Sequence, residues 1–196
     1  SFLPLFGEEA LKIPVALITD ADPQPQLVNG ETAAGEEDDP EEDVDDEDDD
    51  QAAAGEEAKR KRTKAVYPPL GEAVVVSCNT AKMKALEDRY MKVFHGVKTL
   101  EYDLALHEKN RAAMLTALEE LHPNIAKVLR KAVDAEPDNT GKARVLFRGM
   151  FERRQNNVQK GRFGQALAQV IRDGADIEVP AYLRNAIEHA CQVDVR

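Results

Sequence analysis

The chain has 196 residues, with 37 Asp and Glu against 26 Lys and Arg, and its formal net charge is −11. Only two cysteines occur, Cys78 and Cys191, far apart in the sequence, which excludes a disulfide framework or a cysteine metal site. No apolar stretch reaches the roughly 18 residues that span a membrane, and Ser1–Leu5 lack the charged start and the length of a signal peptide. We therefore expect a soluble, cytoplasmic protein of one or two small domains, with both cysteines as buried thiols in a reducing compartment.

The first informative feature is an apolar run that ends in two aspartates. Residues 1–11 suggest a short helix, and residues 13–18 predict a fully buried strand of a parallel sheet. The run continues into Asp20 and Asp22 and stops at Pro23, which cannot continue a strand ladder. In open α/β sheets, ligands bind beyond the carboxyl ends of the strands.

Two carboxylates so close together repel each other unless a positive charge lies between them. Mg²⁺ suits this place because it binds one or two carboxylates together with water and phosphate oxygens. Three other interpretations stay open at this point. They are a turn stabilised by local aspartate hydrogen bonds, a phosphotransfer nucleophile at Asp20, and a sugar-nucleotide metal site.

A block of negative charge follows at residues 36–50, where 13 of 15 positions are acidic. Removing these 13 charges from the total of −11 leaves +2, so the remainder of the chain is slightly basic. A block of this charge density cannot bury apolar surface. Together with the Ala/Gly-rich patch and the basic cluster that follow, it predicts a disordered insertion over about 29–64. A less favoured hypothesis is a phosphate mimic that covers a basic nucleic-acid surface.

The middle of the chain alternates between strand and helix patterns. Residues 74–78 (VVVSC) predict a second buried strand, and Asn79 is expected to cap a helix carrying Met83, Leu86 and Tyr90 on one face. Residues 93–94 predict a short strand closed by Gly96, and residues 98–106 a strand-to-helix junction. This order predicts an α/β fold with a parallel sheet.

Beyond residue 107 the pattern is wholly helical. Apolar residues recur at helical spacing, with breaks near Pro123 and at residues 136–141. An amphipathic stripe from Phe163 to Ile171 ends at Gly174. Pro180 opens a last helix, on which we expect three residues to face inward: Leu183, Ile187 and Cys191. The four histidines show no metal-binding spacing.

Three motifs, in this order, resemble the topoisomerase–primase (Toprim) domain of the overcoming-lysogenization-defect (OLD) nuclease family. They are Ile18-Thr19-Asp20-Ala21-Asp22-Pro23, Lys98-Thr99-Leu100-Glu101-Tyr102-Asp103-Leu104-Ala105 and Lys160-Gly161-Arg162-Phe163-Gly164-Gln165-Ala166-Leu167-Ala168. The resemblance spans residues 13–168, and the acidic insertion is not part of it.

The resemblance implies a partial Toprim-type parallel sheet flanked by helices and an all-helical C-terminal part. The expected divisions are a catalytic part over 1–106, a helical domain over 107–159 and C-terminal helices over 160–196 that contribute to the active site. The implied activity is DNA cleavage with two Mg²⁺ or Mn²⁺ ions. Asp20 and Asp22 would hold one metal, Glu101 and Thr99 a second, and Lys160 would neutralise the scissile phosphate. Asp103 is a weaker candidate, expected to be solvated.

Phosphodiester hydrolysis by two metals does require several carboxylates from separate strand ends, independently of the resemblance. Such nucleases carry an ATPase domain before the Toprim part, but no G-x-x-x-x-G-K-[ST] motif occurs here. The first Toprim strand with its catalytic glutamate is also missing, since Glu8 and Glu9 do not match its position. We expect a fragment of a larger nuclease whose active site is incomplete by itself, with ATP bound only by an ATPase domain absent from this chain.

The partners implied by the resemblance are DNA, that ATPase domain, and a helicase or a second copy. Two alternatives of other classes remain at this stage. One is a non-catalytic DNA-binding or assembly module, and the other is a phosphotransferase or phosphatase that uses Asp20.

Overall fold

The computed structural model describes residues 5–6, 9–23, 26–27 and 63–191. The chain divides into two compact units, Ser1–Gln24 with Tyr67–Arg196, and Pro25–Val66. In the second unit, β2 (Gln26–Leu27) pairs antiparallel with β3 (Thr63–Lys64). The acidic block at 36–50 and nearly all of the predicted insertion lie outside the described residues. No helix of the described part is long and apolar enough to cross a membrane.

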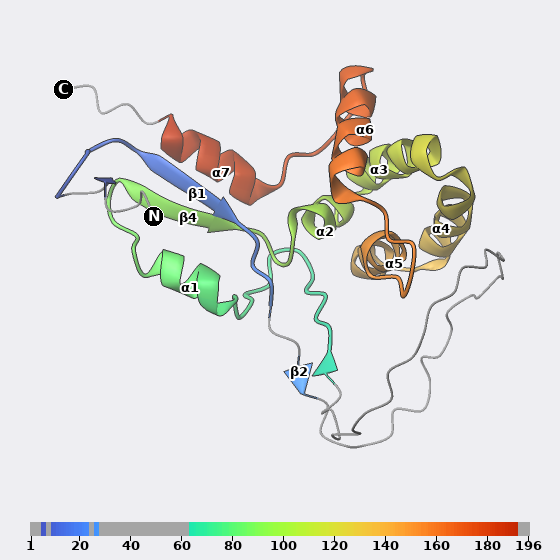
Figure 1. The fold of residues 1–196 in the computed structure, drawn as a ribbon, viewed down its shortest axis with the longest axis horizontal. Helices are drawn as coiled ribbons and strands as arrows, with labels where there is room; N and C mark the ends of the chain where they lie inside the picture. The colour runs from blue at the N-terminus through green and yellow to red at the C-terminus, as the bar shows by residue number, and fades with distance from the viewer. Residues whose placement is uncertain (1–4, 7–8, 24–25, 28–62, 192–196) are drawn as a thin grey trace, which may run out of the picture. The chain divides into compact units, whose positions relative to one another are not determined.

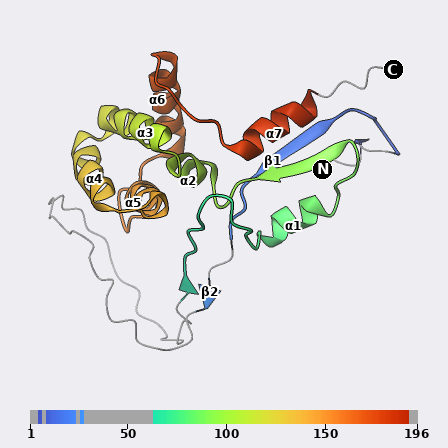
Figure 2. The same ribbon diagram turned by 180° about the vertical axis from the view of Figure 1, so that it is seen from behind.

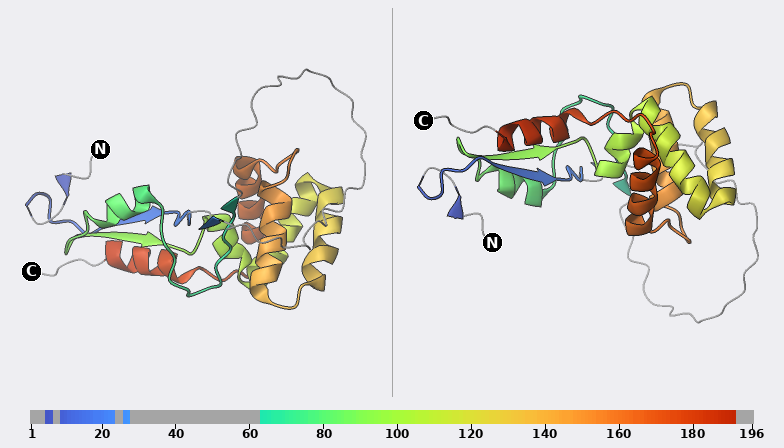
Figure 3. Two further views of the ribbon diagram at one scale, coloured as in Figure 1. Left: turned by 90° about the horizontal axis from the view of Figure 1, so that it is seen from below. Right: turned by 90° about the horizontal axis from the view of Figure 1, so that it is seen from above.

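The first unit contains a two-stranded parallel sheet of β1 (Val15–Thr19) and β4 (Met91–His95). Val15 lies opposite Met91 and Thr19 opposite His95, so both strands end at the same edge. Helices α1 (Cys78–Lys84) and α7 (Ala181–Ala190) lie on either side of the pair (Figure 3). The predicted α/β class with parallel strands is thus confirmed at this coarse level. The prediction that β1 is fully buried is wrong, because two strands leave it an unpaired edge and Ile18 is 53% exposed.

The predicted strand at residues 74–78 is also wrong. Residues 74–76 have no regular structure and pair with no strand, and Val75 is 79% exposed. Ser77 ends this stretch as the N-cap of α1 in place of the predicted Asn79, and its side chain accepts a hydrogen bond from the Thr80 N–H. Valines favour a strand only when a neighbouring strand is available to pair with them, and the described sheet offers none here.

Several smaller predictions in this part also need correction. The described residues of 1–11 form no α-helix, and Phe6 and Leu11 instead form an isolated bridge. Helix α1 ends at Lys84, so Leu86 and Tyr90 lie beyond it, and Leu86 is half exposed. Cys78 and Cys191 are both exposed thiols, because each lies at a helix end rather than on a packed face.

The helical half follows the predicted pattern closely. After α2 (Leu100–Ala105) come α3 (Glu108–Leu121), α4 (Pro123–Ala135), α5 (Asn139–Phe151) and α6 (Lys160–Arg172), which surround most of the buried apolar side chains (Figures 1 and 2). Pro123 occupies the first turn of α4, where its missing N–H costs nothing. Gly174, with a positive φ of 105°, terminates α6.

Helix α7 packs on the sheet through a different face from the predicted one. Ile187 is 60% exposed and Cys191 is exposed, whereas Ala186 is buried. His189 contacts the carbonyl of Tyr90 through Nε2 at 2.9 Å and lies against the Phe94 ring. Tyr182, Leu183 and His189 are half-buried, so of the three residues predicted to face inward only Leu183 is partly covered.

Candidate metal and phosphodiester site

The turn after β1 is fixed by hydrogen bonds to two other segments. The Ala21 and Asp22 N–H groups donate to the Lys98 carbonyl at 2.9 and 3.1 Å. On the other side, the Ser77 N–H donates to the Ala21 carbonyl, and the Thr80 hydroxyl donates to the Asp20 carbonyl at 2.8 Å. Ala21 is completely buried between the two aspartates. The backbone that carries both carboxylates is thus held in one conformation.

Asp22 has an unusual backbone for a residue other than glycine. Its φ is +40°, in the left-handed region, which Asp tolerates better than most side chains. Its N–H shares the Lys98 carbonyl with that of Ala21. Strained backbone of this kind persists only where the surroundings fix it, and it occurs often at functional sites.

The start of α2 places Glu101 beside this turn. The Leu100 N–H donates to Asp20 Oδ1 at 3.2 Å, so the first turn of α2 contacts the strand-end carboxylate directly. Thr99 is the N-cap of the helix, and its buried hydroxyl accepts the Tyr102 N–H at 3.5 Å. The described contact of Thr99 is therefore with the helix, and its role as a metal ligand stays a prediction.

Asp103, the weaker candidate, is the most buried carboxylate of the group. It is 2% exposed, which overturns the prediction that it is solvated. Its Oδ1 accepts the Val97 N–H at 2.9 Å, and the Lys98 N–H also donates to the carboxylate. Gly96 makes room for it, since a Cβ at Gly96 would lie 1.7 Å from Oδ2. Through Asp103, helix α2 thus binds the loop of Val97 and Lys98, and the Lys98 carbonyl of this loop also holds Asp22.

Lys160 reaches this group of acids from α6. Its Nζ lies 3.0 Å from Glu101 Oε2 and 5.4 Å from the centre of the Phe151 ring. The Glu101 side chain is 19% exposed and that of Lys160 53%, so the ion pair borders the solvent. Two predicted site residues 59 positions apart in the sequence are thus in contact, and the role of Lys160 at a scissile phosphate stays a prediction. We refer to Asp20, Asp22, Glu101 and Asp103 as the acidic site.

The electrostatics show that these carboxylates interact. Burial raises the pKa of Asp20, the Leu100 N–H lowers it, Asp22 and Glu101 raise it, and Lys160 lowers it. Burial likewise raises the pKa of Asp103 to about 6, with smaller effects from its neighbours, including Asp20 and Glu101. Like charges this close favour a bound cation, which would stabilise the ionised forms.

Tyr182 is a member of this neighbourhood that the sequence did not reveal. Burial in α7 raises the pKa of its hydroxyl, and the carboxylates of Asp103, Asp20 and Glu101 raise it further. A tyrosine in the first turn of a helix belongs to no sequence motif that would have indicated its position near the acids. Only the packing of α7 on β1 and β4 brings it toward the acids.

The donor set suits Mg²⁺ or Mn²⁺ in its chemistry, because these hard cations prefer carboxylate oxygens. Asp20, Asp22 and Glu101 are the residues that would hold such ions. In the geometry as it stands, no three His, Cys, Asp or Glu side chains of the described residues converge closely enough to hold a metal ion. The only cation in contact with Glu101 among the described ion pairs is Lys160.

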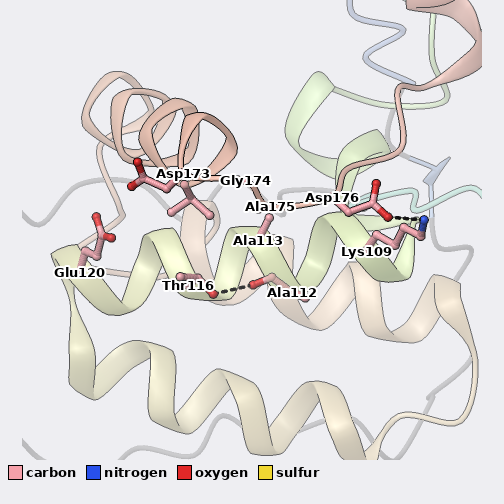
Figure 4. Close-up of a pocket in the computed structure, with 10 residues that line it drawn as sticks. Lys109, Ala112, Ala113, Thr116, Glu120, Asp173, Gly174, Ala175 and Asp176 are labelled. Carbon is pink, nitrogen blue, oxygen red and sulfur yellow. Dashed lines mark hydrogen bonds and ion pairs between the residues drawn. The ribbon is translucent and has the colours of Figure 1, made fainter.

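A separate hollow lies between α3 and the segment that follows α6, away from the predicted site residues (Figure 4). Lys109 and Asp176 form an ion pair at one end of it, and alanines line its floor. None of the four residues of the acidic site lines it.

Comparisons with protein-family models, with curated proteins and with solved structures found no match for this chain.

Proposed function

We propose that this chain carries the metal-dependent catalytic site of a DNA endonuclease. The observation that carries the proposal is the meeting of Asp20, Glu101 and Lys160, from a strand end and two helices, at one place. Carboxylates from separate elements, with a lysine beside them, support the proposal because two-metal phosphodiester hydrolysis uses groups of these kinds. The acidic site would hold Mg²⁺ or Mn²⁺, and bound metal would activate water and stabilise the charge on the phosphate oxygens.

The chain's own groups have distinct roles in this proposal. The Leu100 N–H orients the Asp20 carboxylate, and Asp103 fixes the loop of Val97 and Lys98 on which Asp22 rests. Lys160 offers a positive charge to the scissile phosphate, where charge that grows in the transition state is stabilised most. Tyr182, with its raised pKa, keeps its proton near pH 7 and can donate a hydrogen bond.

The Toprim-type fold remains part of this proposal. It rests on the three motifs, on the parallel pairing of β1 and β4, and on the position of Asp20 and Asp22 just after β1 and of Glu101 on the helix that follows β4. The alternative of a phosphotransferase with Asp20 as nucleophile is less well supported. Asp22 is followed by Pro23 where that chemistry usually has a hydroxyl residue, and Glu101 and Asp103 match the expected further acidic pair only loosely.

Cleavage of supercoiled plasmid in the presence of Mn²⁺ tests the proposal. We expect nicking by the full-length wild-type protein and a loss of about 100-fold or more when it carries Asp20→Ala or Glu101→Ala, because each substitution removes a ligand. Asp134→Ala is the matched control, since Asp134 is an exposed acid on α4. Equal nicking by the full-length Asp20→Ala variant and wild type, or no nicking by the full-length wild-type protein, would refute it.

A further inference from the structure

The charge of the helical half is strongly uneven. Residues 139–172 contain eight Lys and Arg and a single acid, Glu152, in a chain whose net charge is −11. Glu152 accepts a hydrogen bond from the Tyr67 hydroxyl and lies 3.6 Å from Lys98 Nζ, so its charge is offset within the protein. From residue 153 to residue 172 no acid occurs at all. This stretch therefore presents positive charge without an internal counter-charge of its own.

The loop between α5 and α6 displays two of these cations on a fixed backbone. Val158 is buried, and its N–H donates to the Met150 carbonyl at 2.8 Å. The Asn157 side chain accepts the Arg153 N–H at 2.7 Å and donates to the Arg153 carbonyl at 3.1 Å. Arg153 and Arg154 are both exposed. Because the loop is already ordered, little backbone entropy is lost when these side chains bind a partner.

The residues at both ends of this loop are connected to the acidic site by side-chain contacts. At one end, Glu152 contacts Lys98, whose carbonyl accepts the N–H groups of Ala21 and Asp22. At the other end, Lys160 forms its ion pair with Glu101. Arg162, in the first turn of α6, is exposed as well. Arg153 and Arg154 thus directly follow the residue that contacts Lys98, and Arg162 lies two positions after the lysine that contacts Glu101.

We propose that the surface of Arg153, Arg154 and Arg162, here termed the basic ridge, binds the sugar–phosphate backbone of DNA beside the acidic site. The inference rests on the proposed function, since it assigns the substrate's flanking phosphates to a surface. A phosphate at the acids requires a cation, and the next phosphates along the strand meet the guanidinium groups, which bind phosphate oxygens in pairs. Contacts of this kind position the DNA and do not read its sequence.

The test uses a fluorescently labelled DNA duplex, whose binding to the whole chain is measured by anisotropy in EDTA over a range of KCl concentrations. The variant Arg153→Ala/Arg154→Ala removes two charges from the ridge. Its control, Lys127→Ala/Lys131→Ala, removes two charges from exposed positions of α4. We expect the ridge variant to bind about 10-fold more weakly at low salt and to lose about 2 from the slope of log K against log salt. The control should lose much less.

Three results would overturn the basic ridge: equal affinity of the ridge variant and wild type, an equal loss in the control, or no duplex binding by the wild-type chain. Tighter binding of an RNA duplex under the same conditions would contradict DNA as the partner. Nicking in Mn²⁺ separates this inference from the proposed function. If binding depends on the arginines but no nicking occurs, the basic ridge is supported and the endonuclease proposal is refuted. If a ridge variant binds DNA normally and still shows nicking that depends on Asp20, the endonuclease proposal is supported and the basic ridge is refuted.

Discussion

Asp103 shows how one buried carboxylate links two parts of the site. Its carboxylate accepts N–H groups from Val97 and Lys98, and the Lys98 carbonyl in turn accepts those of Ala21 and Asp22. A chain of contacts therefore runs from α2 to the strand-end turn through a single loop. A substitution of Asp103 should therefore alter the position of Asp22, even without a direct contact between the two carboxylates.

The pKa of Asp103 predicts a pH dependence of stability. Burial raises this pKa to about 6 in the folded protein, whereas an unfolded aspartate titrates near pH ~3.9. Between these values the folded state holds the proton more tightly than the unfolded chain. The free energy of unfolding should therefore fall as the pH rises from about 4 to about 6, by up to about 3 kcal/mol, and then level off.

Urea unfolding of wild type and Asp103→Asn, in EDTA between pH 4 and pH 7, measures this effect. The asparagine keeps an acceptor for the Val97 N–H and does not titrate. Stability of the wild type relative to the variant should decrease across this window. A difference that stays constant with pH, or increases, would show that the Asp103 pKa is not raised.

Replacement of Gly96 should lower the stability of the protein. A Cβ there would lie 1.7 Å from Asp103 Oδ2, and the buried carboxylate has two hydrogen bonds to lose if it moves. We expect Gly96→Ala to lower the free energy of unfolding by about 1–3 kcal/mol.

Gly161→Ala is the control for this substitution. No atom lies within 4 Å of a Cβ at Gly161, in the first turn of α6, so its effect should be neutral or stabilising by up to about 1 kcal/mol. Denaturant unfolding measures both variants. Equal stability of Gly96→Ala and wild type would mean that Asp103 has room to move.

At the scale of elements, the sequence predicted the parts whose pattern is set locally. Helices α3 to α6, the strands β1 and β4 and the breaks at Pro123 and Gly174 follow from apolar spacing and from backbone chemistry. Residues 74–78 could not be predicted this way, because a run of valines says nothing about whether a strand is available to pair with it. The contact face of α7 likewise depends on the sheet it meets.

The residues of the candidate site also fall into two groups, those that a local sequence motif predicts and those that only the packing reveals. Asp20, Asp22, Glu101 and Lys160 were identifiable because each lies in a short motif at the end or start of an element. The burial of Asp103 depends on Gly96 and on a loop folded over it, and the approach of Tyr182 depends on helix packing. Neither is visible in local sequence.

Lys160, in the first turn of α6, is expected to contribute to cleavage more than to binding. Lys160 lies against Glu101 and the Phe151 ring, and the buried Phe163 anchors the helix behind it. Lys160→Ala should slow single-turnover cleavage by about 100-fold, because its charge matters most in the transition state. Duplex affinity should fall by less than about 3-fold, since many cations share the contact with a polyanion.

Lys160→Arg keeps the charge and should restore part of the cleavage rate. Comparison of single-turnover rates with equilibrium binding of the same duplex distinguishes the two roles. If Lys160→Ala weakens binding while cleavage at saturating enzyme is unchanged, Lys160 belongs to the basic surface only and has no part in the chemistry.

At the scale of the whole molecule, charge is divided sharply along the chain. The 13 acids of residues 36–50 account for more than the entire net charge, while the acid-free run from 153 to 172 carries five cations. In solutions of low salt, charges of opposite sign attract over about 30 Å, and at physiological ionic strength over about 8 Å. If the acidic block competes with DNA for the proposed basic ridge, we expect this competition to be strongest at low salt.

Deletion of residues 36–50 tests both the structural and the electrostatic side of this interpretation. The block lies outside the described residues, and its composition predicts that folding does not depend on it. The melting temperature should change by less than about 3 °C, since shortening a long connection alters its closure entropy only slightly. Duplex binding should tighten at low salt, and the gain should disappear as KCl is raised.

A variant of full length, with the 13 acids replaced by Ser and Asn, separates charge from length. If it binds DNA as tightly as the deletion variant, the removed charge is the cause, whereas a gain seen only on deletion points to obstruction by the chain itself. A fall of more than about 10 °C in the melting temperature of either variant would mean that the acidic block contributes to the fold, since such a shift corresponds to several kcal/mol in a protein of this size.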